Sequence, residues 1–219
     1  MIRKSITNET HFLILTETKT PIQKFKYKKM KYRLQPTLIS GKETCQTGVA
    51  IYSHPSYQLI HTSSRFSSNP GHFACGIYDN HGSKVLVGAV YGEPSQADQQ
   101  SAAIFKELND TLSELTALYE INNIILAGDF NITFQPSDTT SSINTYVNRK
   151  LRAKQVLYNL LERFQLVDAA KILKRMYTRG IQHHHGHSLP ELITHLLVKT
   201  IPIWSLNNQL QYSIMTCYQ

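Results

Sequence analysis

The chain has 219 residues, of which 41% are hydrophobic and 17% are charged. This length and composition predict a single folded domain with a sizeable core, and they exclude a disordered or low-complexity protein. The formal net charge of +8 indicates an anionic partner, with nucleic acid as the first candidate.

The cysteines and the absence of long apolar runs restrict where the protein can work. Cys45, Cys75 and Cys217 are odd in number and widely spaced, which argues against a disulfide framework and a zinc site and favours a reducing compartment. No apolar run of signal length follows Met1, and no stretch approaches about 18 consecutive apolar residues. We therefore expect an intracellular protein of the nucleus or cytoplasm that is neither secreted nor bound to a membrane.

The first predicted strand ends in a carboxylate. Phe12–Thr16 is a short apolar run typical of a buried strand, and Glu17 follows it directly. A glutamate at that edge is either a solvated surface residue or a metal ligand, and spacing alone leaves both open.

A basic stretch with interleaved aromatic residues follows. Lys26, Lys28 and Lys29 lie in it between Phe25, Tyr27 and Tyr32. It is compatible with a solvated lysine edge that discourages sheet association. It is equally compatible with a surface that binds the phosphate backbone of a nucleic acid while its aromatic rings stack on bases.

Regularly spaced strands separated by turn residues predict an antiparallel meander. The runs are Gly48–Ser53, Tyr57–His61, Phe73–Tyr78 and Lys84–Tyr91. The segment 80–82 between the last two is a good hairpin signal. Tyr91 ends the last run before the turn Gly92-Glu93-Pro94, and its default interpretation is an aromatic residue at the rim of the core.

A helix and a second buried strand complete a predicted crossover. Ser95 is a candidate cap for a helix that runs to about Tyr119. Its apolar stripe predicts core packing and consists of Ile104, Leu108, Leu112, Leu115 and Leu118. The apolar run Ile124–Ala127 then predicts a strand buried on both faces, so that strand, helix and strand form one crossover unit.

The tetrapeptide Gly128-Asp129-Phe130-Asn131 follows this second strand. With alternating side chains, Asp129 and Asn131 point the same way, and Phe130 points into the packing. The pair would suit a water molecule or a phosphate oxygen. The alternative is a turn or helix-cap role for Asp129, which Gly-Asp dipeptides often have.

A second helix is predicted from about Tyr146 to Gln165, with inward-facing side chains at Leu151, Leu157, Leu160, Leu161 and Phe164. Arg149, Lys150 and Arg152 crowd its first turns. Cations oppose the helix dipole there, which favours a phosphate-binding role, although a solvated face remains the alternative. The later histidine cluster, His183, His184, His185 and His187, indicates a flexible polar loop rather than a metal site.

Five segments in order resemble the endonuclease/exonuclease/phosphatase superfamily, and within it the endonuclease domain of jockey-like non-LTR retrotransposons. They are Phe12–Lys19, Gly48–Ser53, Val87–Ser95, Ile124–Asn131 and Ser188–Lys199. The resemblance implies an α/β fold, a DNase I-like four-layer sandwich of two packed mixed sheets flanked by helices. It also implies that residues 1–219 form one such domain, without the first strand of the family and with a degraded C-terminal end.

The resemblance assigns roles to four residues. Glu17 would be a ligand of one Mg²⁺ or Mn²⁺ ion, and the Tyr91 hydroxyl would reach the scissile phosphate. Asp129 and Asn131 would belong to the catalytic group that activates water. The implied reaction is metal-assisted hydrolysis of phosphodiesters in DNA, with RNA as the second candidate.

The C-terminal motifs depart from the family pattern. Thr194 stands where the family has an aspartate that orients the catalytic histidine, and Tyr212-Ser213-Ile214 stands where it has Ser-Asp-His. The expectation is therefore an endonuclease-type domain of retrotransposon origin with weakened or lost activity. The alternative is a non-catalytic remnant that binds nucleic acid.

Overall fold

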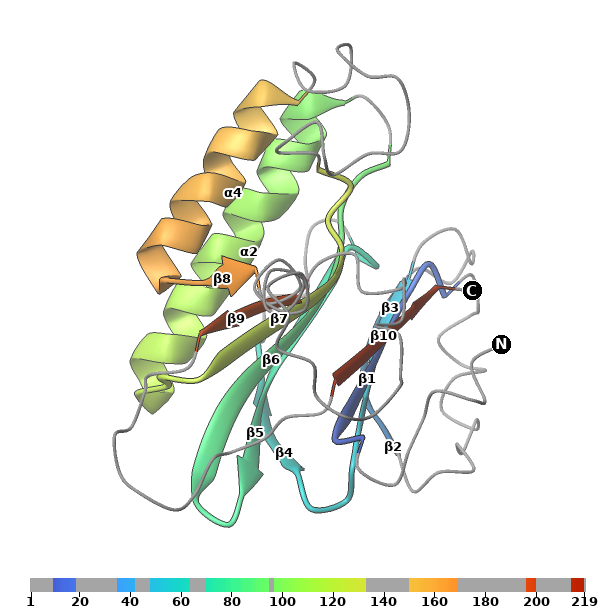
Figure 1. Ribbon diagram of the computed structural model, residues 1–219, viewed down its shortest axis with the longest axis vertical. Coiled ribbons are helices and arrows are strands. Elements are labelled where there is room, and N and C mark those ends of the chain that lie inside the picture. Colours follow the sequence, from blue (N-terminus) through green and yellow to red (C-terminus); the bar gives the residue numbers. More distant parts are fainter. Residues whose placement is uncertain are drawn as a thin grey trace, which may run out of the picture.

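Two β-sheets packed face to face form the centre of the molecule, and two helices cover the outer face of the larger sheet (Figure 1). The computed structural model describes residues 10–18, 35–41, 48–63, 70–94, 97–132, 150–168, 196–199 and 214–218. Within these ranges no helix combines the length and the apolar character that crossing a membrane requires.

The smaller sheet has four strands, and both parallel and antiparallel pairs occur in it. The strands are β1 (Phe12–Thr16), β2 (Gln35–Gly41), β3 (Gly48–Ser53) and β10 (Ile214–Tyr218). Their order is β10-β1-β3-β2, in which β1 pairs in parallel with β10 and antiparallel with β3. Strand β1 is fully buried, as its continuous apolar run predicts.

The larger sheet has six strands in the order β4-β5-β6-β7-β9-β8. They are β4 (Gln58–Thr62), β5 (Phe73–Asn80), β6 (Ser83–Tyr91), β7 (Ile124–Asp129), β8 (Val167–Asp168) and β9 (Leu196–Lys199). Strands β4, β5 and β6 form the predicted antiparallel meander. Its extension to Gly48–Ser53 was wrong, because β3 pairs with β1 and β2 in the other sheet.

The predicted crossover between two parallel strands is confirmed. Strand β6 leads into helix α2 (Asp98–Tyr119), which returns the chain to β7. Strands β6 and β7 then pair in parallel, with Tyr91 beside Asp129. The carboxyl ends of both strands therefore meet at one edge, where open α/β sheets usually place their chemistry.

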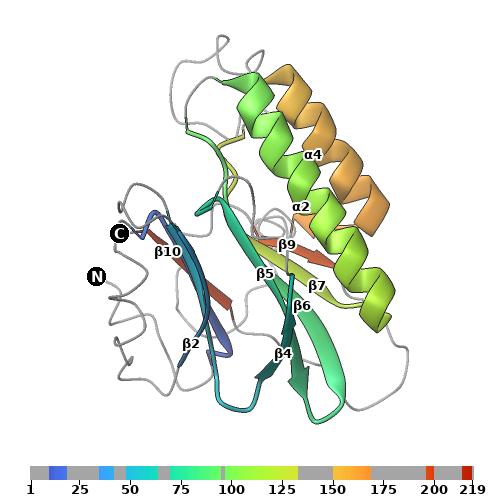
Figure 2. The same ribbon diagram turned by 180° about the vertical axis from the view of Figure 1, so that it is seen from behind.

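Helix α4 (Leu151–Phe164) packs beside α2 (Figure 2). It begins later than expected, because Lys150 has a φ of 55° and its backbone cannot continue a right-handed helix. The predicted inward position of Leu151 was wrong, since this first helical residue is 62% exposed.

Helix α2 also differs from the prediction at its two ends. Its N-cap residue is Ala97, so the capping role assigned to Ser95 was wrong; Asp98 makes hydrogen bonds to α4 instead. Leu118 is 64% exposed rather than buried. Both views show that the C-terminal end of α2, near which Leu118 lies in the sequence, extends past the end of α4 (Figures 1 and 2).

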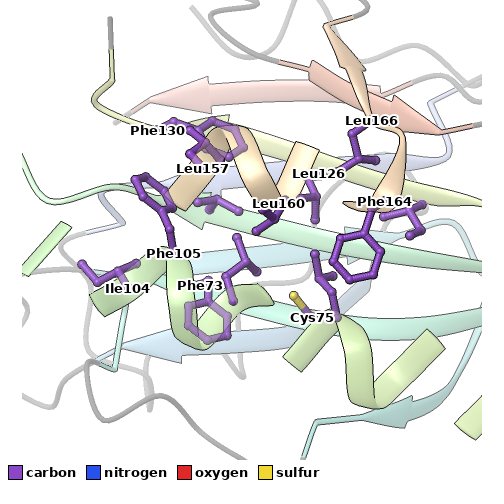
Figure 3. Close-up of a cluster of buried hydrophobic side chains, with 14 of the residues drawn as sticks. Phe73, Cys75, Ile104, Phe105, Leu126, Phe130, Leu157, Leu160, Phe164 and Leu166 are labelled. Atoms are coloured by element: carbon purple, nitrogen blue, oxygen red, sulfur yellow. The ribbon is translucent and has the colours of Figure 1, made fainter. Parts of the chain in front are cut away.

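One hydrophobic core lies between the helices and the larger sheet, and the other lies between the two sheets. In the first, Phe130 packs against Phe105 with ring centroids 6.3 Å apart, among side chains of both helices (Figure 3). In the second, alternate residues of β6 and β7 face β1 and β3. Each fully buried large apolar side chain contributes about 1.5–3 kcal/mol.

The expected α/β architecture of two packed mixed sheets flanked by helices is confirmed. The described residues form three layers, namely the helix pair and the two sheets. A fourth layer, on the outer face of the smaller sheet, would fall outside the described ranges.

Candidate active site

The candidate site lies where the carboxyl ends of β1, β6 and β7 come together between the two sheets. Along β6, Val87, Ala89 and Tyr91 belong to the core between the sheets, so their side chains point towards the smaller sheet. Tyr91 is the last residue of this strand and is 5% exposed. Its hydroxyl therefore reaches the end of β1 rather than solvent.

Glu17 meets Tyr91 from the other sheet. The Tyr91 hydroxyl donates a hydrogen bond of 2.6 Å to Oε1 of Glu17. Strict alternation after Phe12 and Ile14, which face the core between the sheets, would turn Glu17 to the opposite face. A left-handed φ of 51° at Glu17 interrupts that alternation, and the carboxylate comes to Tyr91.

Asp129 lies beside Tyr91 on the adjacent parallel strand. The two strand ends approach closely, since the amide of Gly92 donates a 2.7 Å hydrogen bond to the Asp129 carbonyl. A Cβ at Gly92 would stand 1.9 Å from the carbonyl oxygen of Phe130. A side chain at this position would therefore push the strand ends apart.

Asn131 is held by its neighbours rather than by strand geometry. Strand β7 ends at Asp129, and Asn131 has a φ of 49°. Its amide donates to Oδ1 of Asp129 at 2.9 Å, and its Nδ2 donates to the Gly92 carbonyl at 2.9 Å. Strand alternation therefore does not set the direction of the Asn131 side chain. The predicted inward packing of Phe130 is confirmed, because this residue is 2% exposed.

The environment of Tyr91 keeps its hydroxyl protonated. The pKa of Tyr91 is raised, first by burial, then by the hydrogen bond to Glu17 and by the negative charges of Glu17, Asp129 and Glu93. At neutral pH this phenol is a hydrogen-bond donor with no tendency to ionise. Such a donor suits an oxygen that gains negative charge during a reaction.

His72 also contacts Tyr91, although the sequence interpretation did not select it. Its Nδ1 donates to the Tyr91 carbonyl at 2.8 Å, and the Tyr91 amide donates to the His72 carbonyl at 2.6 Å. The two rings stack with centroids 6.0 Å apart. The sequence held a signal for this contact, namely the hairpin turn. The turn pairs Asn80 with Ser83, and continuing this antiparallel register along both strands places His72 opposite Tyr91.

The residues predicted to contact nucleic acid differ in their exposure to solvent. Arg152 is exposed in the first turn of α4. Lys150 is buried, with 9% exposure, and its Nζ donates hydrogen bonds to the carbonyls of Glu93 and Asn131. The remaining predicted contacts, Lys26, Lys28, Lys29 and Arg149, lie outside the described residues.

Unusual backbone conformations concentrate at this site. Six non-glycine residues in the described ranges have a positive φ, namely Glu17, His81, Glu120, Asn131, Lys150 and Gln165. His81 lies in the hairpin turn, and Glu120 and Gln165 follow helix ends, where this conformation is common. The other three lie at the site, and each costs on the order of 1–3 kcal/mol of strain, which is typical of functional positions.

The carboxylates at the site supply some of the ligands that a hard divalent cation needs. Mg²⁺ commonly takes one or two protein carboxylates and completes its shell with water and substrate oxygens. Glu17 and Asp129 are carboxylates near the same phenol. The described part of the chain holds no group of three or more His, Cys, Asp or Glu residues arranged for a metal, so such an ion would depend on water and substrate for most of its ligands.

Comparisons with solved structures identify the fold. Neither protein-family models nor curated protein sequences match the chain. Truncated TDP2 from Caenorhabditis elegans aligns with 88% of this chain and 72% of its own, at a TM-score of 0.50 and 15% identity. The human Nocturnin catalytic domain with bound sulfate aligns with 86% of this chain and 69% of its own, at a TM-score of 0.53 and 14% identity.

Because the sequences of these two proteins are only 15% and 14% identical to this chain, the comparison shows the fold alone. Both are DNase I-like members of the endonuclease/exonuclease/phosphatase superfamily. The two packed mixed sheets and the helix pair of this chain agree with that architecture. The chain therefore has a DNase I-like fold.

Proposed function

We propose that this chain is a metal-dependent phosphodiesterase domain of endonuclease type, of retrotransposon origin, that acts on DNA. The observation that supports it most is the 2.6 Å hydrogen bond between Tyr91 and Glu17. This bond joins the two sheets at the edge where Asp129 stands beside Tyr91. Three groups suited to phosphodiester hydrolysis, Glu17 just after β1, Tyr91 in β6 and Asp129 in β7, thereby lie at one place.

Each residue has a defined part in this proposal. Glu17 would hold one Mg²⁺ or Mn²⁺ ion, which supplies positive charge to a bound phosphate. Asp129 accepts a proton from the attacking water, and Asn131 is fixed beside it by two hydrogen bonds. Tyr91, protonated at neutral pH, donates to a phosphoryl oxygen as negative charge develops there.

The anionic substrate is supported by charge as well as by the site. The chain carries a net charge of +8, and Arg152 is exposed at the start of α4. We assign Lys26, Lys28, Lys29, Arg149 and Arg152 to the DNA backbone, with RNA as the second candidate. Lys150 is left out of this assignment because the residue is buried and its ammonium donates to backbone carbonyls of the chain.

A second candidate function is a non-catalytic remnant that binds nucleic acid. The observation in its favour is the replacement of the family's C-terminal aspartate and Ser-Asp-His by Thr194 and Tyr212-Ser213-Ile214. One electrostatic group of this kind is commonly worth about 10²–10³ in rate. Losing a histidine together with its orienting carboxylate would therefore leave binding as the main remaining property.

Incubation of supercoiled plasmid with purified protein and Mg²⁺ separates the two candidates. Nicking that Asp129→Ala abolishes, and that the exposed control Lys106→Met retains, supports the phosphodiesterase. Plasmid binding with a steep salt dependence but no nicking supports the remnant. If the protein neither nicks nor binds plasmid at low salt, both functions are contradicted.

A further inference from the structure

Lys150 occupies an unusual position for a lysine. It is 9% exposed and directly precedes helix α4, with a left-handed φ of 55°. A buried ammonium is costly unless hydrogen-bond acceptors and negative charges surround it. A positive charge at a helix N-terminus also opposes the helix dipole. Specific partners must therefore offset both effects.

The two acceptors of the Lys150 ammonium lie on the two loops that follow the catalytic strand ends. One is the carbonyl of Glu93, two residues after Tyr91, and the other is the carbonyl of Asn131, at 3.3 Å, two residues after Asp129. One ammonium therefore connects the loop after β6 with the loop after β7.

The backbone that carries Lys150 is itself fixed. Both carboxylate oxygens of Asp98, from helix α2, accept hydrogen bonds from the first turn of α4, at 3.0 Å from the Arg152 amide and 2.8 Å from the Ala153 amide. Helix α4 has no acidic residue of its own in its first turn. Asp98 thus anchors the helix start from which Lys150 reaches the loops.

Charge favours the same arrangement. Burial lowers the pKa of Lys150, and the carboxylates of Glu93, Asp129 and Asp98 oppose that change. An uncharged side chain of similar length would fill the same space. It would leave the carbonyls of Glu93 and Asn131 without this donor and the three carboxylates without this countercharge.

We propose that Lys150 is a positioning residue of the phosphodiesterase site: by bridging the carbonyls of Glu93 and Asn131, its ammonium fixes the spacing between Tyr91 and Asp129. Only the effect of Lys150 on the rate of hydrolysis rests on the proposed function. The bracing of the two loops is a property of the folded chain and can be measured without any substrate.

Two amides report directly on the braced loops. The Gly92 amide donates to the Asp129 carbonyl at 2.7 Å, and the Asn131 amide donates to the Asp129 carboxylate at 2.9 Å. In Lys150→Met we expect hydrogen exchange at both amides to accelerate on the order of tenfold, because lost bridging lets the loops open locally. Amides of the β5–β6 hairpin, such as Ile77, should keep their rates.

Two further variants complete the test. Lys106→Met removes an exposed lysine of α2 and should leave both exchange rates and nicking unchanged. Lys150→Arg keeps the charge with a different donor geometry, and its exchange at Gly92 and Asn131 should lie between wild type and Lys150→Met. If Lys150→Met does not fold, the test relies on Lys150→Arg. Wild-type exchange rates at the Gly92 and Asn131 amides of Lys150→Arg would then overturn the proposal.

Kinetics separate positioning from a purely structural role. Lys150→Met should lower kcat by about 10²-fold with little change in KM, since a misplaced catalytic group loses rate rather than binding. If the wild-type protein does not hydrolyse DNA, the proposed function is refuted. The exchange rates at Gly92 and Asn131 still test whether Lys150 braces the two loops. Unchanged exchange at Gly92 and Asn131 in a folded Lys150→Met overturns the positioning role, whatever the activity.

Discussion

The hydroxyl of Tyr91 and the carboxylate of Glu17 are 2.6 Å apart, although they belong to different sheets and stand 74 positions apart in the chain. If Tyr91 donates to a phosphoryl oxygen during hydrolysis, Tyr91→Phe removes that donor while keeping the ring that stacks on His72. We expect plasmid nicking to slow by about 10²–10³, with DNA binding unchanged in a gel-shift assay. A Tyr91→Phe variant that nicks at the wild-type rate would remove Tyr91 from the reaction.

The raised pKa of Tyr91 predicts a loss of stability in alkali. Below its ordinary pKa of 10.0, the phenol keeps its proton in the folded and the unfolded chain. Above that pH the unfolded chain releases the proton first, so the free energy of unfolding falls as pH rises towards the folded pKa. Other buried tyrosines, Tyr52, Tyr57 and Tyr78, contribute in the same direction.

Tyr91→Phe isolates the contribution of this one phenol, because the other tyrosines are present in both proteins. Between about pH 8 and about pH 11, urea unfolding should show a larger loss of stability for the wild type than for Tyr91→Phe. Equal losses in the two proteins would mean that Tyr91 titrates alike in the folded and unfolded states.

Gly92 is predicted to be required for the close approach of β6 and β7. A methyl group in Gly92→Ala would meet the Phe130 carbonyl oxygen at 1.9 Å, and we expect a destabilisation of about 2–4 kcal/mol. Gly82→Ala is the matched control, because a Cβ there meets nothing within 4 Å and suffers only from a φ of 88°. That control should cost about 1–2 kcal/mol. Thermal unfolding in which Gly82→Ala is the less stable variant would contradict this assignment.

Asp98 is predicted to stabilise the start of α4 from the neighbouring helix. Asp98→Ala removes both acceptors of the Arg152 and Ala153 amides and should cost about 0.5–2 kcal/mol, as the loss of a helix cap does. Asp98→Asn keeps one oxygen and should cost less. Asp110→Ala removes an exposed aspartate of the same helix and is expected to stay within about 0.5 kcal/mol of the wild type by urea unfolding.

Local sequence patterns were sufficient for the elements that bring Tyr91 and Asp129 together. The apolar runs predicted all but the first residue of β6 and most of β7, and the helical stripe between them predicted the crossover. Once β6 and β7 are parallel, their carboxyl ends are neighbours. This half of the site follows from periodicity and from the handedness of crossovers.

The other half depends on features that periodicity does not encode. Glu17 reaches Tyr91 only because its backbone leaves the strand conformation at φ 51°. Lys150 looked like a surface cation because it stands among other basic residues, yet its acceptors are backbone carbonyls, which carry no sequence signal. The sheet to which β3 belongs is likewise decided by pairing with β1, which lies more than thirty positions earlier in the chain.

The dependence of plasmid nicking on Mg²⁺ in wild type and Glu17→Gln tests the central claim most directly. If Glu17 holds the metal at the Tyr91–Asp129 edge, the wild type nicks supercoiled plasmid with a saturable dependence on Mg²⁺ concentration. Glu17→Gln should then need far more Mg²⁺ or lose nicking altogether, while Lys106→Met follows the wild-type curve. Identical Mg²⁺ dependence in wild type and Glu17→Gln would contradict the account, because the carboxylate opposite Tyr91 would then have no part in binding the metal.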